Sequence, residues 1–168
     1  VVEQRAYHRG DNDSDIDQED GHNYASVKQY ARGRNADNDS DIDQEGYHND
    51  AVVEQRATYG GDNESDIEQN GGSHYSTGNT ASVLQVATRY GSNDSLIEQD
   101  GTENEACVDQ YARGGFNESD IMQTGSLNSA SVVQSSMTGY SNTSCITQTG
   151  TGNEACVQQV GTPVPGGM

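Results

Sequence analysis

Hydrophobic residues are sparse in this chain, and they recur at fixed places within a short phrase. In the first occurrence, Asn12, Ser14, Ile16 and Gln18 stand at alternate positions. Residues two apart lie on the same face of a β-strand, so the phrase predicts a strand whose Asn–Ser–Ile–Gln face points inward. A phrase of the same period, Asn–x–Ala–x–Val–x–Gln, alternates with it and predicts a sister strand.

The two phrases together define a predicted stacking ladder. The first phrase contributes Asn12, Ser14, Ile16, Gln18, Asn38, Ile42, Gln44, Ile67, Gln69, Ile97, Gln99, Ile121, Gln123, Ile146 and Gln148. The sister phrase contributes Asn23, Ala25, Val27, Gln29, Asn49, Val53, Gln55, Val83, Gln85, Val108, Gln110, Val132, Gln134, Val157 and Gln159. Successive full repeats lie 26, 25, 30, 24 and 25 residues apart, which is typical of stacked units.

The segments between the phrases predict how the units connect. Four residues separate Gln18 from Asn23, and the same tight turn recurs in five of six repeats. The return turn has six to eight residues and is expected to be looser. The predicted fold is all-β, a two-sheet β-solenoid of strand–turn–strand (β-arch) repeats with cross-β stacking and about 6.5 turns. We expect one array over residues 1–161 and a C-terminal tail over 162–168, with no capping unit at either end.

Composition taken alone suggests a different class. Ile, Leu, Val and Phe make up 23 of the 168 residues, and the net charge is −19. Such values are typical of intrinsically disordered chains, which cannot bury enough apolar surface to fold. The fixed register of the repeat argues against disorder, because stacked strands pair with neighbours on both sides and need only a thin core.

The spacing Asn/Ser-x5-Gln-x4-Asn-x5-Gln closely resembles the curlin repeat of bacterial curli, over about residues 1–161. The resemblance implies a structural subunit of an extracellular functional amyloid fibre, polymerising head to tail for biofilm matrix and surface adhesion. It also implies secretion and partners that include other copies, a nucleator subunit, a secretion pore and matrix polymers. This chain departs from the family in having Asn12 and its equivalents where most curlin repeats open with Ser, Asp20 in place of a turn glycine, and a higher density of acidic residues.

Acidic residues concentrate on the outward positions of the first strand. The predicted ladder of carboxylates comprises Asp13, Asp15, Asp17, Asp39, Asp41, Asp43, Glu64, Asp66 and Glu68. Stacking would bring like charges about 4.8 Å apart, so we expect bound cations, raised carboxylate pKa values or a basic partner to relieve the repulsion. An EF-hand is excluded because Gln18 stands where that loop needs Gly. Loosely bound Ca²⁺ or another divalent cation and a merely solvated face both remain open, and no other cofactor is expected.

Positive charges avoid the acidic strand. Arg5, Lys28 and Arg56 fall on the sister strand, and Arg9, Arg32, Arg34, Arg89 and Arg113 fall in the predicted wide turn. One interpretation is a tolerant solvated surface. The other is lateral pairing of filaments, either against the acidic side of a neighbour or through the apolar patches of this side. Nucleic acid is not expected as a partner at a net charge of −19.

Few reactive side chains remain. Cys107, Cys145 and Cys156 are predicted to point outward, where unpaired thiols and bridges between filaments both remain open. His22 and His48 are predicted to stack one turn apart, in a solvated turn or as a two-histidine metal contact. The sequence lacks a nucleophile–base pattern, a phosphate loop and a Cys-x-x-Cys motif, so we do not expect an enzyme. It also lacks a signal peptide or membrane span, as expected for a mature secreted chain that is not membrane-embedded. The alternative to a fibre subunit is a monomeric acidic β-solenoid adhesin or divalent-cation-binding module.

Overall fold

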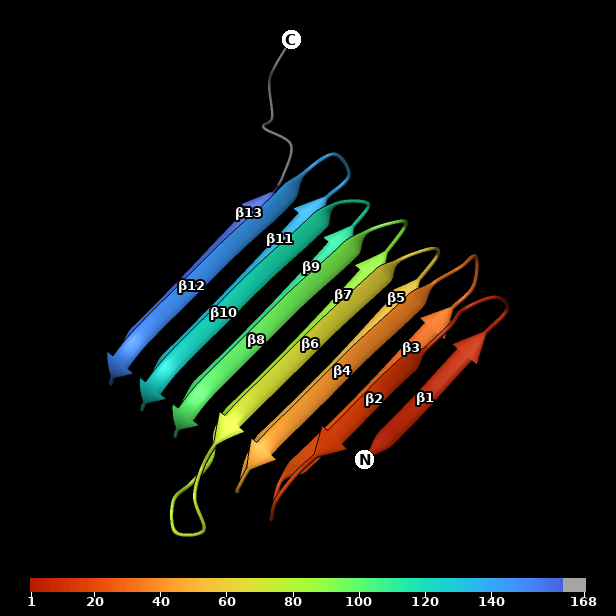
Figure 1. Cartoon of the computed structure of the whole chain (residues 1–168). Coiled ribbons are helices and arrows are strands. Elements are labelled where there is room, and N and C mark those ends of the chain that lie inside the picture. Colours follow the sequence, from red (N-terminus) through yellow and green to blue (C-terminus); the bar gives the residue numbers. More distant parts are fainter. Residues whose placement is uncertain (162–168) are drawn as a thin grey trace.

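The computed structural model of the chain describes residues 1–161, which form thirteen strands in two facing sheets and no helix (Figure 1). The seven-stranded sheet contains β1 (Val2–Tyr7), β3 (Tyr24–Arg32), β5 (Asp50–Thr58), β7 (Thr80–Thr88), β9 (Glu105–Arg113), β11 (Ser129–Met137) and β13 (Glu154–Gly161). The six-stranded sheet contains β2 (Asp13–Gln18), β4 (Asp37–Gly46), β6 (Asp62–Gly71), β8 (Ser92–Thr102), β10 (Phe116–Ser126) and β12 (Ser141–Thr151). Successive strands alternate between the sheets, and all sheet pairs are parallel. The predicted two-sheet β-solenoid is therefore confirmed.

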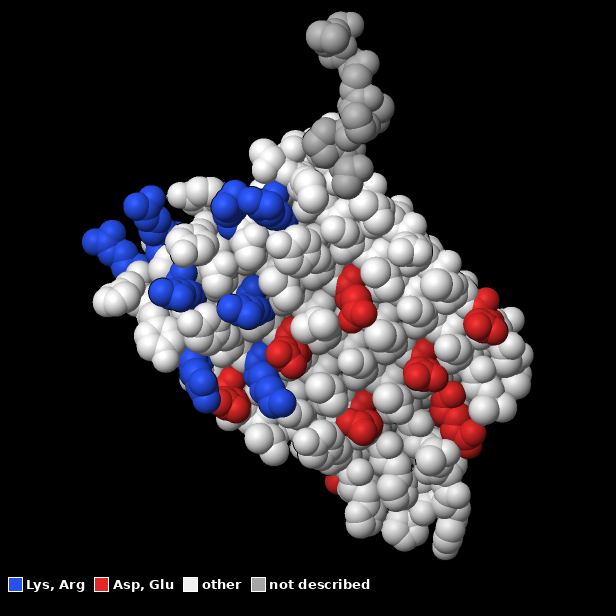
Figure 2. All heavy atoms as spheres, turned by 180° about the vertical axis from the view of Figure 1, so that it is seen from behind, with Lys and Arg blue, Asp and Glu red and all other residues white. Residues whose placement is uncertain are grey.

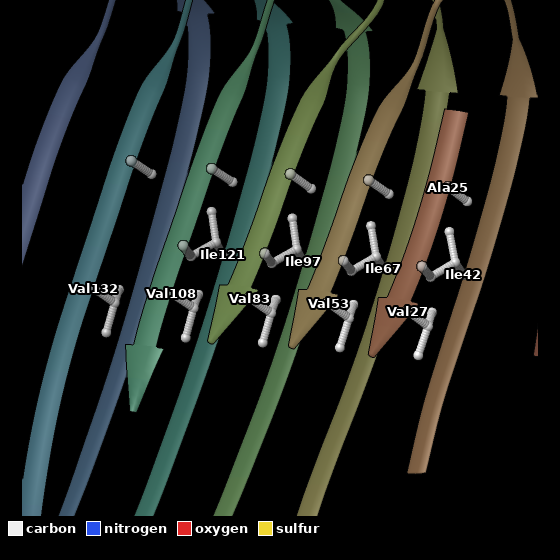
Figure 3. Packing of buried hydrophobic residues seen from close by; sticks show 14 of the residues in the cluster. Ala25, Val27, Ile42, Val53, Ile67, Val83, Ile97, Val108, Ile121 and Val132 are labelled. Carbon is white, nitrogen blue, oxygen red and sulfur yellow. The ribbon is translucent and has the colours of Figure 1, made fainter. Parts of the chain in front are cut away.

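The register matches each phrase with its own copy one turn away. Ile42 pairs with Ile67, and Ile67 pairs with Ile97. The resulting isoleucine column faces a valine column from the other sheet, and both are enclosed over the central turns (Figure 3). Ile16 and Val157, on the first and last turns, are only partly buried, because each lacks a described neighbour on one side. A core this narrow is sufficient because the alternating polar residues of each phrase also stack.

Glycine at the tight turn is dictated by backbone contact. Gly46, Gly71, Gly101, Gly125 and Gly150 form a column with φ between +99° and +151°. A Cβ on Gly71 would lie 1.7 Å from the carbonyl oxygen of Gly101, so no other residue fits. Asp20 takes this place in the first repeat, and there β2 ends at Gln18, two residues earlier in the phrase than β4 ends. The loss of the glycine therefore coincides with a shorter ladder.

The tight turn of the third repeat has five more residues than the other tight turns, and these extra residues leave the stack intact. They form the loop between β6 and β7 that extends beyond the other tight turns in Figure 1. Pairing continues on both sides of it, from Gly71 to Gly101 and from Thr80 to Glu105. The insertion changes the outline of the solenoid but not its register.

The expectation of a loose return turn was wrong. Only residues 33–36, 59–61, 89–91, 114–115 and 138–140 lie outside strands on this side of the complete turns. Ala31, Ala57, Ala87 and Ala112 form a fully buried column two residues beyond the glutamines. Gly61 approaches Ala87 so closely that a Cβ on it would lie 2.4 Å from the Ala87 carbonyl oxygen. This second column of small residues lets the sheets close together and extends the ladder into the turn. Because β3 and β9 extend as far as Arg32 and Arg113, these two arginines end strands and do not lie in the turn, where they were expected.

Candidate functional site

Glutamine side chains form two continuous chains of hydrogen bonds along the solenoid. On the six-stranded sheet, the Nε2 of Gln44 donates to Oε1 of Gln69 at 2.7 Å, and Gln69 donates to Gln99 at 2.8 Å. On the seven-stranded sheet, Gln55 donates to Gln85 at 2.9 Å. The donor always belongs to the earlier turn, so each glutamine chain has a direction. These amides are almost completely buried, and leaving one unpaired would cost about 1–3 kcal/mol.

The same glutamine amides also join the two sheets. Gln55 Nε2 donates to the backbone carbonyl of Asp39 at 2.6 Å, and Gln69 Nε2 donates to that of Asp50 at 3.2 Å. Both hydrogens of the amide are therefore used, one along the stack and one across it. A hydrophobic side chain of similar size could make neither contact, which explains why glutamine closes both phrases.

Asparagine chains run in the opposite direction. Asn63 Nδ2 donates to Oδ1 of Asn38 in the preceding turn at 2.8 Å, and Asn93 donates to Asn63 at the same distance. The asparagines of the sister phrase also close the tight turn, since Asn49 Nδ2 donates to the Glu45 carbonyl at 2.9 Å. Asparagine thus links neighbouring turns of the solenoid and also fixes the shape of each tight turn between strands.

The chains end at side chains with free hydrogen-bonding capacity. Within residues 1–161, Gln159 accepts from Gln134 at 2.8 Å and has no glutamine beyond it to which it can donate. At the other end, Gln4 donates to Gln29 at 3.0 Å and receives no amide. The Nδ2 of Asn12 is buried without a hydrogen-bond partner among the described residues. One end of the described stack therefore presents a glutamine donor and the other a glutamine acceptor.

The acidic ladder lies on the outer face of the six-stranded sheet. Asp13 pairs in register with Asp39, and Asp39 with Glu64. Burial, followed by repulsion from Asp41 and other neighbouring carboxylates, raises the pKa of Asp66. Burial and neighbouring acids likewise raise the pKa values of Asp39, Asp62, Glu64 and Asp94. The nine predicted ladder residues, Asp13, Asp15, Asp17, Asp39, Asp41, Asp43, Glu64, Asp66 and Glu68, occupy three adjacent columns on β2, β4 and β6.

The acidic columns do not form a closed cation site. Among residues 1–161, no group of three or more His, Cys, Asp or Glu side chains is arranged to hold a metal ion. Alternate positions on a strand space the carboxylates along the surface instead of around a point. Among residues 1–161 the acidic columns therefore do not surround a single ion.

The remaining reactive side chains are spread over the surface. His22 and His48 stack with ring centroids 5.2 Å apart and planes 9° apart. Cys107, Cys145 and Cys156 are free. Cys107 and Cys156 each pair in register with Ser131, so two strand spacings separate them. Burial, together with the nearby Asp109 and Glu105, raises the pKa of the Cys107 thiol, which makes it a poorer nucleophile at neutral pH.

Comparison with protein families matches two segments of the chain, residues 35–71 and 101–135, to the curlin associated repeat. These two segments match the curlin repeat family. The first matched curlin segment contains β4, β5 and β6, and the second contains β9, β10 and most of β11. Comparisons with curated proteins and with solved structures gave no match. Curlin repeats are structural units, and residues 1–161 contain no helix long and apolar enough to cross a membrane.

Sequence reasoning missed two features of these curlin repeats. One is the alanine column at Ala31, Ala57, Ala87 and Ala112, which was visible as an alanine two residues after four of the six glutamines that close the sister phrase. The other is the opposite direction of the Gln and Asn chains, for which the sequence has no signal. Both depend on how closely the two sheets approach each other.

Proposed function

We propose that this chain is the structural subunit of a curli-like extracellular amyloid fibre that contributes to biofilm matrix and surface adhesion. The curlin repeats and the cross-β solenoid support this role. The same proposal carries secretion, and it takes other copies of the chain as the main partner. A nucleator subunit, a secretion pore and matrix polymers are further partners consistent with the curlin family.

The observation that carries the proposal is the complementarity of the two ends of the amide chains. Gln159 has an amide hydrogen available for a following turn, and Gln4 has a carbonyl oxygen that accepts none. When β13 of one copy pairs with β1 of the next, the glutamine chain of the seven-stranded sheet continues in the same direction. Exposed parallel edges of this kind add further strands readily.

This junction leaves one strand position to be filled. Residues 1–161 supply seven strands to one sheet and six to the other. Pairing β13 with β1 therefore leaves a place between β12 and the next copy's β2, beside the unpartnered Nδ2 of Asn12. A strand from outside residues 1–161 would fill this position. Alternatively, if β1 of the next copy leaves its sheet, β12 can pair directly with β2 of that copy and the vacant position disappears.

Polymerisation of the purified chain tests the proposal. We expect thioflavin fluorescence to rise after a lag that shortens with protein concentration, and electron microscopy to show unbranched fibres. Val157→Pro removes a backbone donor from the edge strand and should slow growth at that end. A chain that stays monomeric for days at high concentration would contradict the proposal and favour a monomeric adhesin.

A second proposed role is loose binding of divalent cations along the acidic ladder, which three columns of carboxylates with raised pKa values favour. Millimolar Ca²⁺ should shorten the assembly lag more than Na⁺ at equal ionic strength. Screening by monovalent salt acts weakly at contacts shorter than the Debye length of about 8–10 Å. Equal effects of the two cations would show that the ladder is only a solvated face.

A further inference from the structure

Positive charge is confined to one side of the solenoid. All eight Lys and Arg residues lie in the strands of the seven-stranded sheet or in the adjoining wide turns. Figure 2 shows them gathered over one end of that sheet, away from most of its acidic residues. We call the group near the wide turns the arginine edge, and it consists of Arg5, Arg9, Arg32, Arg34, Arg56 and Arg89.

The arginine edge is almost without partners in its own chain. Within residues 1–161 the single ion pair joins Arg5 to Glu3, at 2.5 Å. The guanidinium of Arg56 lies 5.6 Å from the centroid of the Tyr30 ring. The side chains of Arg9, Arg34 and Arg89 are exposed at turns, with no carboxylate of residues 1–161 within 4.0 Å. These planar donors are available to an external anion.

The acidic ladder, in turn, has no cationic partner among residues 1–161. It occupies β2, β4 and β6, the same turns that carry most of the arginine edge, and no Lys or Arg side chain pairs with it in the described structure. The two groups point to opposite sides of facing sheets whose backbones are about 10 Å apart. One copy therefore cannot neutralise its own ladder, whereas two copies side by side can.

The two surfaces also share an axial period. Both follow the same solenoid: the carboxylates recur at every strand spacing of about 4.8 Å, and Arg5 and Arg56, which both pair in register with Tyr30, are two such spacings apart. Parallel or antiparallel filaments in contact keep this match along their length. A shallow hollow of about 330 Å³ on the seven-stranded face is lined by Arg5, Lys28, Tyr30 and Arg56 together with Glu3 and Glu54, and its three cations outnumber its two carboxylates.

We propose that neighbouring filaments pair laterally, with the acidic ladder of one copy packed against the arginine edge of another. The inference rests on the proposed fibre function and adds the surface through which fibres associate. A second copy is the fitting partner because it carries both an anionic ladder and an arginine edge along the same axis, so one contact pairs both surfaces. A free polyanion could cover the arginine edge but would leave the acidic ladder without a cationic partner.

Complementation between two variants tests this pairing. The ladder variant carries Asp39→Asn, Asp41→Asn, Glu64→Gln and Asp66→Asn, and the edge variant carries Arg9→Gln, Arg32→Gln, Arg34→Gln and Arg89→Gln. A control with Asp50→Asn, Glu105→Gln, Asp109→Asn and Glu154→Gln removes the same number of carboxylates from the other sheet, outside the hollow and away from the Arg5–Glu3 ion pair. All three are first required to form single filaments, detected by thioflavin fluorescence and electron microscopy. Bundles are then counted at low salt.

Wild-type and control filaments should bundle, whereas the ladder and edge variants alone should show at least a five-fold loss. Mixing preformed filaments of the two variants, one carrying a gold label, should restore bundles that contain both. Removing four acids lowers the net repulsion, so a purely colloidal mechanism predicts more bundling by the ladder variant. That result, or a failure of the mixture to recover, would overturn lateral pairing while leaving the fibre function intact. An absence of wild-type filaments would instead overturn the proposed function.

Discussion

Ile67 and Asp66 are adjacent in β6 but face opposite sides, and this contrast gives a sharp test of the strand faces. Ile67 is fully buried in the isoleucine column between Ile42 and Ile97, whereas Asp66 is exposed in the acidic ladder. We predict that Ile67→Asp prevents cooperative folding of the central turns and abolishes assembly. Asp66→Asn, one residue away, should leave both intact.

The size of the effect follows from burial. Truncating a fully buried Ile costs about 2–5 kcal/mol through lost transfer energy and the cavity left behind. Placing a carboxylate there without a partner adds several kcal/mol, even if the group becomes protonated. Small domains have total stabilities of about 5–15 kcal/mol, so the substitution removes much or all of the margin. Because each turn contacts only its neighbours, the loss should be centred on β4, β6 and β8.

Urea unfolding followed by circular dichroism measures the stability, and thioflavin kinetics measure assembly. Hydrogen exchange locates the damage, which should appear as faster exchange of β6 and the strands paired with it. Ile67→Ala serves as an intermediate variant and should lower the free energy of unfolding by about 2–5 kcal/mol. Equal tolerance of Ile67→Asp and Asp66→Asn would refute the assignment of inward and outward faces.

Three further predictions address the acidic ladder, the glycine column and the junction. The pKa values of Asp39, Glu64 and Asp66 are raised above their ordinary values of 3.8, 4.5 and 3.8, so protonation favours the folded stack. The stability gained by protonation is complete below the ordinary pKa values and is lost as pH rises through the raised pKa values of the folded state. Urea midpoints should therefore be higher near about pH 4 than at pH 7. Gly101→Ala should lower the thermal midpoint strongly, because its Cβ would lie 1.9 Å from the Gly125 carbonyl oxygen. Gly152→Ala should lower the midpoint much less, because Gly152 also has a positive φ but its Cβ would meet no atom within 4 Å. Similar losses for the two variants would show that φ strain alone, and not the close contact, causes the destabilisation. Deleting residues 1–10 removes β1 and with it the acceptor Gln4 of the proposed junction, so seeded growth should slow, and faster growth would indicate that β1 is displaced at the junction.

The repeat made most of this fold predictable from sequence. Ile and Val at a period of two, each followed two residues later by Gln, set strand type, inward face and register together, because a slip of one residue would expose the core. Gly46 and its equivalents marked the tight turn because their backbone conformation and close contacts exclude a side chain. Each of these features is local to one repeat and is copied in the next.

Features that arise between sheets were harder to predict. The buried Ala57 and the neighbouring Gly61 look like ordinary turn residues until the approach of the two sheets is known. The direction of the amide chains depends on which backbone carbonyl each Gln reaches on the opposite sheet, as Gln55 reaches Asp39. The arginine edge required knowing that Arg9 and Arg34 lie at turns and that neither has a carboxylate of residues 1–161 within 4.0 Å. Repetition in the sequence specifies stacking, whereas contacts across the core depend on three-dimensional distances.

The axial rise per subunit in fibres of the purified chain, measured by cryo-electron microscopy, tests the central claim most directly. If each copy keeps its solenoid and stacks end to end, the rise is six to seven strand spacings, about 29–34 Å, with the sheets of successive copies in line. A rise of one strand spacing, about 4.8 Å per chain, would mean that the solenoid unfolds into flat in-register layers, and it would contradict the account.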